Sequence, residues 1–480
     1  MEFGAPYSDP GPAGGPGEGG RLPPMRLARL TLLLALAPLG CGGGGAERPP
    51  NVVLLVLDTV RADHLGCYGH AGAATPFLDG LAGTADRYTR VESTAPWTLP
   101  SHASMFTGRF AFEHGADSGR APDGRVYDAA PLGPRLPTLA EALAERGYAT
   151  TAFAANTAYL NERFGLQRGF DSWSVERGTA LQVNGRFFGW LEERADDGRP
   201  FFAFLNYMDA HRPYNVAPLA GERGAKLPAP DPTPSGDLLD ALYAQVLARG
   251  EAPDPELVAK IEVQYDHGIA WLDQAVEAVV TQLEARGLWQ DTLLVVTADH
   301  GEFLGEHGLV EHSKDIYQEV LRVPLLVHAP GQTRGRVVDE RTTLAALPRL
   351  VLEHVPGAEA QRERFPAHGP DSAVLAEVHF TRGKDLDAPW GARFQRERFA
   401  IFADRYKLIL STDGDDELFD LEADPGELHD LSEERPRLFE ALAGRLRSLV
   451  QAGAAARGEV GEAPELDADQ LEELRRLGYL

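Results

Sequence analysis

Cysteine is almost absent from this sequence, because only Cys41 and Cys67 occur among 480 residues. Two cysteines allow at most one disulfide, so a small fold stapled by several disulfides is excluded. Basic residues are also scarce, since 46 Lys and Arg stand against 72 Asp and Glu and leave a net charge of −26. A surface of this charge repels nucleic acid and anionic membranes, so we expect no nucleic acid as a partner.

The apolar segment near the start is too short to cross a membrane. Residues 25–41 (MRLARLTLLLALAPLGC) have a basic start, a short apolar core and a small residue before Cys41. This is the form of a secretory signal. Leu39-Gly40-Cys41 resembles a bacterial lipoprotein processing site, which predicts an exported protein of the bacterial cell envelope or periplasm, attached to the membrane only through a lipid anchor at Cys41. An ordinary signal peptide with an incidental cysteine is the alternative.

Composition divides the rest of the chain into four regions. Residues 1–24 are rich in Gly and Pro, and we expect a disordered lead or a mis-called start before Met25. Residues 42–49 begin with a run of glycines, which predicts a flexible tether. Residues 50–370 and 371–480 carry the patterns of folded structure, and their character changes where the first gives way to the second.

Residues 50–370 predict an α/β catalytic domain with a large doubly wound, mostly parallel sheet flanked by helices. Its strand candidates lack alternation, as strands buried on both faces do. These candidates are 51–57, 149–155, 199–206 and 292–298. Helices are predicted after Pro137 up to Gly147 and over 257–286. Residues 216–238 predict a long loop that borders the substrate cleft.

The region over 371–480 predicts a smaller antiparallel sheet with helices after it. Turn residues such as Asp413-Gly414 separate short strand candidates. The predicted strands are 372–378, 398–403, 406–411 and 417–421, and the predicted helices are 435–454 and 468–477.

Two of the predicted buried strands stop at acidic residues. The run that begins at Asn51 ends at Asp58, and the run that begins at Thr292 ends at Asp299-His300. Ligands of open α/β sheets collect at the carboxyl ends of the strands. Two carboxylates, an imidazole and the Thr98 hydroxyl are therefore expected to meet at one edge and hold a divalent cation, with the hydroxyl as the nucleophile.

The segment around Thr98 resembles the signature of the sulfatase family in the alkaline-phosphatase superfamily. That signature is Cys or Ser, then x-Pro-Ser-Arg, four residues and Thr-Gly, and Pro100, Ser101 and Thr107-Gly108 match it. Further similar segments follow in family order from about residue 50 to the C-terminus. They include 58–69 (DTVRADHLGCYG), 165–171 (GLQRGFD), 209–214 (DAHRPY), 299–308 (DHGEFLGEHG), 322–325 (RVPL) and 417–427 (ELFDLEADPGE).

The chain departs from this family pattern at two positions. Thr98 stands where sulfatases have the Cys or Ser that is oxidised to formylglycine, and His102 stands where they have arginine. Threonine is not a substrate for that oxidation, so we expect no formylglycine. The resemblance therefore implies that water must attack sulfur or phosphorus directly to free Thr98, as in the phosphodiesterase, phosphonate-hydrolase and phosphoglycerol-transferase relatives.

The resemblance also implies a metal site. Asp58, Thr98, Asp299 and His300 correspond to the family's metal positions, whereas Thr59 replaces a second Asp. With one carboxylate fewer and one imidazole present, a single Mn²⁺ or Zn²⁺ is favoured, and Mg²⁺ or Ca²⁺ stays open.

The remaining site candidates are basic. The resemblance implies that His211 contacts the ester oxygens, as general acid or as a charge stabiliser. Lys314 and His312 both lie where the family places a charge-stabilising base, and the sequence does not choose between them. His102 is expected to hold Thr98 or a substrate oxygen, or else to be a helix-surface histidine. Arg61 and Arg322 fit either an anion site or packing ion pairs.

Together these features predict a metal-dependent sulfatase-family hydrolase that cleaves an anionic sulfuric or phosphoric ester through a metal-activated threonine. One alternative is a phosphodiesterase or phosphoryl-group transferase acting on envelope material or lipid head groups. A non-catalytic binding protein on the same fold is the other alternative.

Overall fold

The computed structural model describes residues 48–120, 126–127, 129–194, 197–368, 372–381 and 383–457. The predicted signal, tether and lipid anchor, and the helix predicted over 468–477, lie outside these residues. The chain from Glu47 to Leu480 clusters as one compact unit, which contains both predicted folded regions. Among the described residues, no helix has the length and apolarity that crossing a membrane requires.

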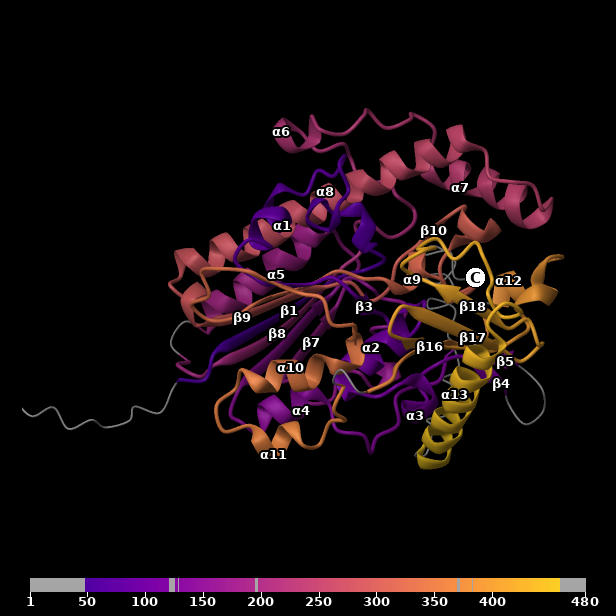
Figure 1. Ribbon diagram of the computed structural model, residues 1–480. Coiled ribbons are helices and arrows are strands. Elements are labelled where there is room, and N and C mark those ends of the chain that lie inside the picture. Colours follow the sequence, from indigo (N-terminus) through magenta and orange to yellow (C-terminus); the bar gives the residue numbers. More distant parts are fainter. Residues whose placement is uncertain are drawn as a thin grey trace, which may run out of the picture. The chain divides into compact units, whose positions relative to one another are not determined.

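A mixed, mostly parallel sheet of eight strands forms the centre of the molecule (Figure 1). Its order is β13 (Arg336–Val338), β2 (Asp86–Tyr88), β12 (Leu325–His328), β9 (Thr292–Thr297), β1 (Asn51–Leu57), β8 (Phe201–Tyr207), β6 (Ala149–Ala154) and β7 (Ser172–Val175). From β9 to β7 all neighbours are parallel, whereas β12 runs antiparallel to both β9 and β2. The predicted sheet is therefore confirmed, and β2, β12 and β13 extend it on one side.

Burial explains why the central strands show no alternation of apolar and polar residues. Every residue of β1, β6, β8 and β9 is buried, since helices cover both faces of the sheet. Figure 1 shows α1, α5 and α8 on one face and α2, α4, α10 and α11 on the other. Their bounds are α1 Pro76–Leu81, α2 Thr98–Thr107, α4 Leu139–Ala144, α5 Ala180–Glu193, α8 Pro255–Ala285, α10 Leu347–Glu353 and α11 Glu359–Arg362.

Local signals set several of these boundaries. Thr138 caps α4, because its hydroxyl accepts from the backbone N–H of Glu141 while the Glu141 carboxylate accepts from the backbone N–H of Thr138. The helix predicted from 257 is α8, which begins at Pro255 after the Asp254 cap.

The loop predicted over 216–238 is partly wrong. It contains α6 (Gly221–Gly224), and α7 (Ser235–Tyr243) begins inside it. The apolar side chains of α7 supply the missed helical signal, since Leu238, Leu239 and Leu242 are buried.

A second sheet of four antiparallel strands follows, as predicted. Its order is β15 (Val374–Val378), β16 (Arg398–Ala403), β17 (Tyr406–Ser411) and β18 (Glu417–Asp420). Side chains alternate between its two faces. One face packs on the segment 303–321 of the catalytic region, and the other packs on α3 (Ala111–His114) and the long α13 (Pro436–Ala456).

Short elements complete the described structure. The remaining strands pair as β3 (Val91–Glu92) with β14 (Thr342–Thr343), β4 (Gly119–Arg120) with β5 (Val126–Tyr127), and β10 (Phe303–Leu304) with β11 (Val310–Glu311). The remaining α-helices of the described residues are α9 (Gln318–Leu321) and α12 (Gly383–Leu386). Segments 303–311 and 318–321 connect the carboxyl end of β9 to β12, so they lie at the edge where ligands are expected.

Candidate metal centre and active site

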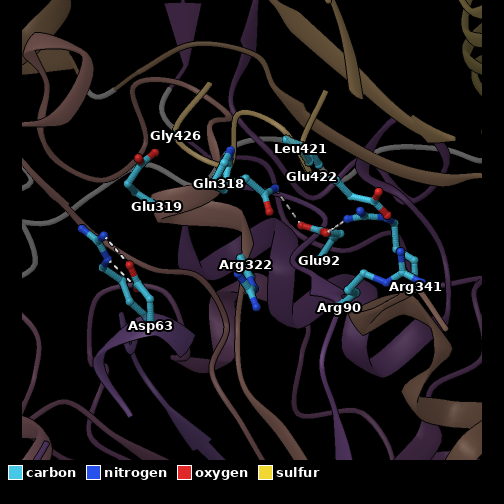
Figure 2. Close-up of a pocket in the computed structure, with 12 residues that line it drawn as sticks. Asp63, Arg90, Glu92, Gln318, Glu319, Arg322, Arg341, Leu421, Glu422 and Gly426 are labelled. Atoms are coloured by element: carbon cyan, nitrogen blue, oxygen red, sulfur yellow. Dashed lines mark hydrogen bonds and ion pairs between the residues drawn. The ribbon is translucent and has the colours of Figure 1, made fainter. Parts of the chain in front are cut away.

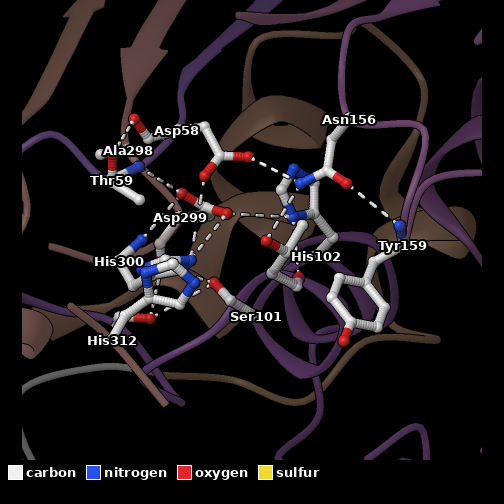
Figure 3. Close-up of polar contacts among 12 residues, drawn as sticks. Asp58, Thr59, Ser101, His102, Asn156, Tyr159, Ala298, Asp299, His300 and His312 are labelled. Carbon is white, nitrogen blue, oxygen red and sulfur yellow. Dashed lines mark hydrogen bonds and ion pairs between the residues drawn. The ribbon is translucent and has the colours of Figure 1, made fainter. Parts of the chain in front are cut away.

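The parallel pairing of β1 with β9 brings the acidic ends of the two strands together. Asp58 follows β1 directly, and Asp299-His300 comes two residues after β9 ends. The His300 Nε2 atom lies 3.4 Å from Asp299 Oδ2 and 3.9 Å from Asp58 Oδ1. Figure 3 shows the three side chains turned toward one another.

These three side chains fit a divalent cation. Each is fully buried, and a potential ligand atom from each lies within 4.8 Å of the other two. Two ligands held about 2.1 Å from one ion stand roughly 3 to 4 Å apart, which is the spacing of these atoms. Among the described residues, Asp58 Oδ1 and His300 Nε2 make no hydrogen bond. Buried polar atoms that lack partners are costly, and a cation between them would satisfy both.

The surroundings oppose charge on the two carboxylates. Burial, and after it the neighbouring Asp299 carboxylate, raise the pKa of Asp58 to about 7. Burial also raises the pKa of Asp299 to about 7. Burial lowers the pKa of His300, so this imidazole stays neutral and able to bind a metal. A bound cation would reverse the pressure on both carboxylates, because it stabilises their ionised forms.

Neighbouring groups hold the three side chains in place. Asp299 Oδ1 accepts from the backbone N–H of Thr59 at 3.2 Å and from that of His300 at 3.0 Å. His300 Nδ1 lies 2.9 Å from the Gly301 carbonyl oxygen, and this contact turns Nε2 toward the two carboxylates. Gly301 is required here, since a Cβ at this position would lie 2.0 Å from the Glu319 carbonyl oxygen.

Thr59 does not supply a further metal ligand. Its φ of 61° is strained for a β-branched residue and turns the backbone sharply after Asp58. Its hydroxyl lies 2.7 Å from the Asp58 carbonyl oxygen and 3.0 Å from that of Ala210, and it can donate to one of them at a time. The hydroxyl thereby ties the loop after β1 to the loop that carries His211.

Thr98 lies beside the three side chains, at the first position of α2. Asn156 Nδ2 donates to Thr98 Oγ1 at 3.2 Å and to Asp58 Oδ2 at 3.0 Å, so one amide joins the hydroxyl to the carboxylate. A hydrogen bond with the Thr98 side chain also lowers the pKa of Asp299 against the dominant effect of burial. The structure thus brings Asp58, Thr98, Asp299 and His300 together, and we call these four side chains the metal cluster.

The helix behind Thr98 is fixed firmly. All ten residues of α2 are buried, and Gly108 ends the helix with a φ of 69°. The Ser101 hydroxyl donates to the Asp299 carbonyl oxygen at 2.7 Å, which locks the N-terminus of α2 to the end of β9. Free N–H groups at a helix N-terminus favour an anion, so the first turn of α2 suits an anionic ester.

His102 is not a surface histidine, because its side chain is fully buried. Its Nδ1 atom lies 2.9 Å from the Thr98 carbonyl oxygen and 3.6 Å from Asp299 Oδ2. Burial lowers its pKa to about 3, so His102 is neutral. Of the alternatives predicted from the sequence, this position supports holding the backbone of Thr98.

Two further histidines form a row with His300. The ring centroid of His312 lies 4.7 Å from that of His300 and 5.1 Å from that of His211. His312 Nδ1 lies 2.8 Å from Glu302 Oε1, and His211 Nδ1 lies 2.7 Å from the Arg212 carbonyl oxygen. Burial lowers the pKa of His211 to about 3.

Lys314 lies in a different buried cluster. Its Nζ atom donates to the Tyr243 hydroxyl at 2.8 Å and lies 3.2 Å from Asp385 Oδ2. Glu311 accepts from the same Tyr243 hydroxyl and pairs with Arg212. Between the two bases that the sequence left open, His312 is therefore the one that lies against the metal cluster.

Arg61 and Arg322 line a separate pocket of about 520 Å³ (Figure 2). Arg61 forms ion pairs with Asp63 and Glu306, and Arg322 Nη2 donates to the Thr89 carbonyl oxygen at 3.3 Å. No member of the metal cluster lines this pocket. The packing alternative for Arg61 is thus the one that the structure supports.

Three polar residues of the site were missed by the sequence reading: Asn156, Asn206 and Glu302. Asn206 lies near the end of β8 and Asn156 two residues beyond β6, and both donate to Asp58 Oδ2. The rule that drew attention to Asp58 and Asp299, a polar residue at the end of a buried strand, also applies to these two. Glu302 lacked such a signal, because its role depends on His312, which the chain reaches only after the β10–β11 turn.

Comparisons with known proteins show which family the chain is similar to. The family model described as sulfatase matches residues 50–358. The ulvan-active sulfatase of Formosa agariphila is 24% identical over 80% of this chain and 77% of its own length. The multifunctional alkaline phosphatase superfamily protein PehA of Trinickia caryophylli is 25% identical over 80% of this chain and 91% of its own.

Solved structures share the fold. The phosphonate monoester hydrolase of Agrobacterium radiobacter superposes with a TM-score of 0.63 at 19% identity, over 84% of this chain and 96% of that one. A structure solved with its substrate D-glucosamine-2-N,6-O-disulfate superposes with a TM-score of 0.63 at 19% identity, over 85% and 98%. At these identities the likeness establishes the architecture alone.

Proposed function

Because the chain belongs to the sulfatase family and is a hydrolase of ester bonds, we propose that it cleaves a sulfuric or phosphoric ester with the unmodified hydroxyl of Thr98 as nucleophile. One observation supports this assignment above all. Asn156 donates to both Thr98 Oγ1 and Asp58 Oδ2, so the hydroxyl is fixed beside the two buried carboxylates and His300. Since Oγ1 accepts from Asn156, its own hydrogen is directed elsewhere, toward Asp299.

The metal cluster would hold one divalent ion through Asp58, Asp299, His300 and the Thr98 oxygen. When bound, such an ion lowers the pKa of a hydroxyl and offsets negative charge on an ester. One imidazole and two carboxylates favour Mn²⁺ or Zn²⁺ over Ca²⁺, which takes six to eight oxygen ligands. Thr59 adds no oxygen ligand, because its hydroxyl faces backbone carbonyls, and this strengthens the preference for Mn²⁺ or Zn²⁺.

The first chemical step forms a bond from Thr98 Oγ1 to sulfur or phosphorus and breaks the bond to the alcohol oxygen, while the hydroxyl proton of Thr98 is released to solvent. We propose that His211 donates the proton that the alcohol oxygen takes up. His211 is neutral in the free protein, because burial lowers its pKa. An anionic ester beside the ring favours the protonated form that this step needs. Since Nδ1 is held by the Arg212 carbonyl, the proton exchange is assigned to Nε2.

The second step returns the enzyme to its starting state. Water attacks sulfur or phosphorus, gives one proton back to His211, and breaks the bond to Thr98 Oγ1, which takes up a proton from solvent. His312 lies against His300 and is oriented by Glu302. We assign to it a hydrogen bond to an ester oxygen on which negative charge grows.

A phosphodiesterase or phosphoryl-group transferase is the second candidate. Threonine has one hydroxyl, whereas hydrated formylglycine has two. A sulfo or phospho group on Thr98 therefore cannot be released by breaking the C–O bond of the side chain, which is the sulfatase route. Relatives with related chemistry support this candidate, among them the phosphonate monoester hydrolases that share the fold. Envelope material and lipid head groups are the proposed substrates, because the segment over 25–41 predicts export and a lipid anchor at Cys41.

The test compares aryl sulfate with aryl phosphate monoesters and diesters after each of Mn²⁺, Zn²⁺, Mg²⁺ and Ca²⁺ is restored to metal-free protein. We expect hydrolysis that depends on added Mn²⁺ or Zn²⁺ and on Thr98. Sulfatase activity above the phosphodiesterase activity would reject the preference for phosphorus. Full turnover by Thr98→Ala would reject the nucleophile.

A further inference from the structure

We propose that His64, His70 and Asp266 form a second cation site, separate from the metal cluster, which binds Zn²⁺ or a similar transition-metal ion. His64 ends the short 3₁₀ helix η1 (Ala62–His64), and His70 follows the next one, η2 (Gly66–Tyr68). Asp266 lies in the first half of α8. Two loop histidines therefore face a carboxylate on a rigid helix.

The spacing of the three side chains suits a shared ion. A potential ligand atom from each lies within 4.8 Å of the other two. His70 Nε2 lies 3.8 Å from Asp266 Oδ2, too far for a hydrogen bond but within the roughly 3 to 4 Å that separates two ligands of one ion. The same kind of gap separates the ligand atoms of the metal cluster, where His300 Nε2 is 3.9 Å from Asp58 Oδ1.

Two of the ligands are already held in position. His64 Nδ1 lies 2.7 Å from Asp266 Oδ1, and the His64 and His70 rings stack with their centroids 5.2 Å apart. The Tyr265 ring meets the edge of His64 at 5.0 Å. A site with fixed ligands binds an ion without first having to order them.

A simple ion pair would explain the contact between His64 and Asp266, but it would not explain why His70 also lies beside Asp266. Glu262, one turn before Asp266 on α8, interacts electrostatically with both His64 and Asp266 and adds negative charge nearby. The side chains of His64, Asp266 and His70 are 8%, 15% and 33% exposed. The site is thus open enough for water to complete the coordination of an ion, and two imidazoles with one carboxylate favour Zn²⁺ over Ca²⁺ or Mg²⁺.

The ion would brace the loop that follows Asp58. Tyr265, adjacent to Asp266, accepts from the Arg61 backbone N–H at 2.9 Å and donates to the Thr59 carbonyl oxygen at 2.6 Å. A clamp between residues 64–70 and α8 therefore holds both ends of the turn that begins at Asp58. This role is structural and does not depend on the proposed reaction.

The test measures zinc per chain by elemental mass spectrometry in the full-length protein, after saturation with Zn²⁺ and removal of excess. The wild type is expected to hold about two ions and His70→Ala about one, while His300→Ala, which loses the other site, also holds about one. The double variant is expected to hold close to none. His429→Ala is the matched control, because His429 also pairs with a carboxylate, at 3.0 Å from Glu434, and belongs to no group of three potential ligands within the described part of the chain.

Thermal unfolding gives a second readout. Zn²⁺ should raise the unfolding midpoint of His300→Ala, which keeps the second site, and should not raise that of the double variant. His70→Gln can replace His70→Ala in the double variant. Equal zinc content in the wild type and His70→Ala would overturn the second site. Loss of zinc in His70→Ala but not in His300→Ala would instead reject the catalytic metal and leave the second site standing.

Discussion

The segment over 311–317 separates two buried charged regions that are built on opposite principles. On one side His312 faces the metal cluster, where two carboxylates lie close together and form no ion pair with a Lys or Arg of the described residues. On the other side Asp315 faces the second sheet and pairs with Arg398, which also pairs with Glu417. We call Asp315, Arg398 and Glu417 the ion-pair network.

The charges of the ion-pair network are paired with one another, whereas the two carboxylates of the metal cluster share no Lys or Arg partner among the described residues. Arg398 is fully buried, and its guanidinium contacts carboxylates on both sides, with Asp315 Oδ1 at 2.5 Å. In the metal cluster, burial instead raises the pKa of both carboxylates to about 7, and two ligand atoms have no hydrogen bond among the described residues. Charges that pair within the protein stabilise the junction of the two sheets, while charges left without a counterion prepare a site for one.

The largest expected effect on activity in this comparison is that of Thr98→Ala, which removes the hydroxyl of the metal cluster. We expect kcat/KM to fall by at least about 10³-fold, because loss of a nucleophile removes the covalent route. The midpoint of thermal unfolding should change little. Thr98→Ser keeps a hydroxyl and should recover much of the activity.

Thr151→Ala is the matched control for Thr98→Ala. Thr151 is another fully buried threonine, whose hydroxyl lies 2.7 Å from that of Ser172. Its loss should leave steady-state kinetics near the wild-type values. Equal activity losses in the two variants would mean that Thr98 acts through packing rather than chemistry.

Arg398→Met should have the opposite effect. It removes the cation that buried Asp315 shares with half-buried Glu417 and leaves only Arg396 paired with Asp315, which costs up to about 3–5 kcal/mol of unfolding free energy. Denaturant titration measures this loss, and the activity per folded molecule should be preserved. Arg249→Met is the control, because both partners of the Arg249–Glu251 pair are solvent-exposed and the pair should contribute little.

Acid should weaken metal binding. Asp58 and Asp299 must lose their protons before they bind a cation, and both have a pKa of about 7. Affinity should therefore decline as pH drops below 7, by about 10- to 100-fold per unit, since one or two protons compete with the ion. Competition with a chromophoric chelator between pH 5.5 and 8 measures it. A flat profile would show that the two carboxylates are not ligands.

The smallest expected effect is that of Glu302→Gln, which tests a positioning residue. The amide no longer holds the His312 ring as the carboxylate does at 2.8 Å, so kcat should fall about 10- to 100-fold with little change in KM. The acidic limb of the pH profile should shift as well, which a purely structural role would not cause. Glu302→Asp should restore part of the rate.

The sequence allowed the centre of the fold to be predicted because its strands are buried on both faces. Apolar runs identified β1, β8 and β9, β6 was predicted after the helix that ends at Gly147, and the acids after β1 and β9 pointed to the metal cluster. The short strand β2 and the edge strand β13 were not predicted, since three residues carry no usable period.

The choice between His312 and Lys314 could not be made from the sequence. Glu311 and Ser313 have positive φ values of 62° and 63°, so the backbone reverses direction twice within this segment. Neither strand nor helix periodicity then tells which side chain faces the metal cluster. Only the folded chain shows His312 against His300 and Lys314 against Tyr243.

Mass spectrometry of protein quenched in acid during turnover tests the role of Thr98 most directly. A sulfo or phospho group should be found on the peptide that contains Thr98, localised to that residue, and be absent from Thr98→Ala. The same group found on another side chain during productive turnover would contradict the account.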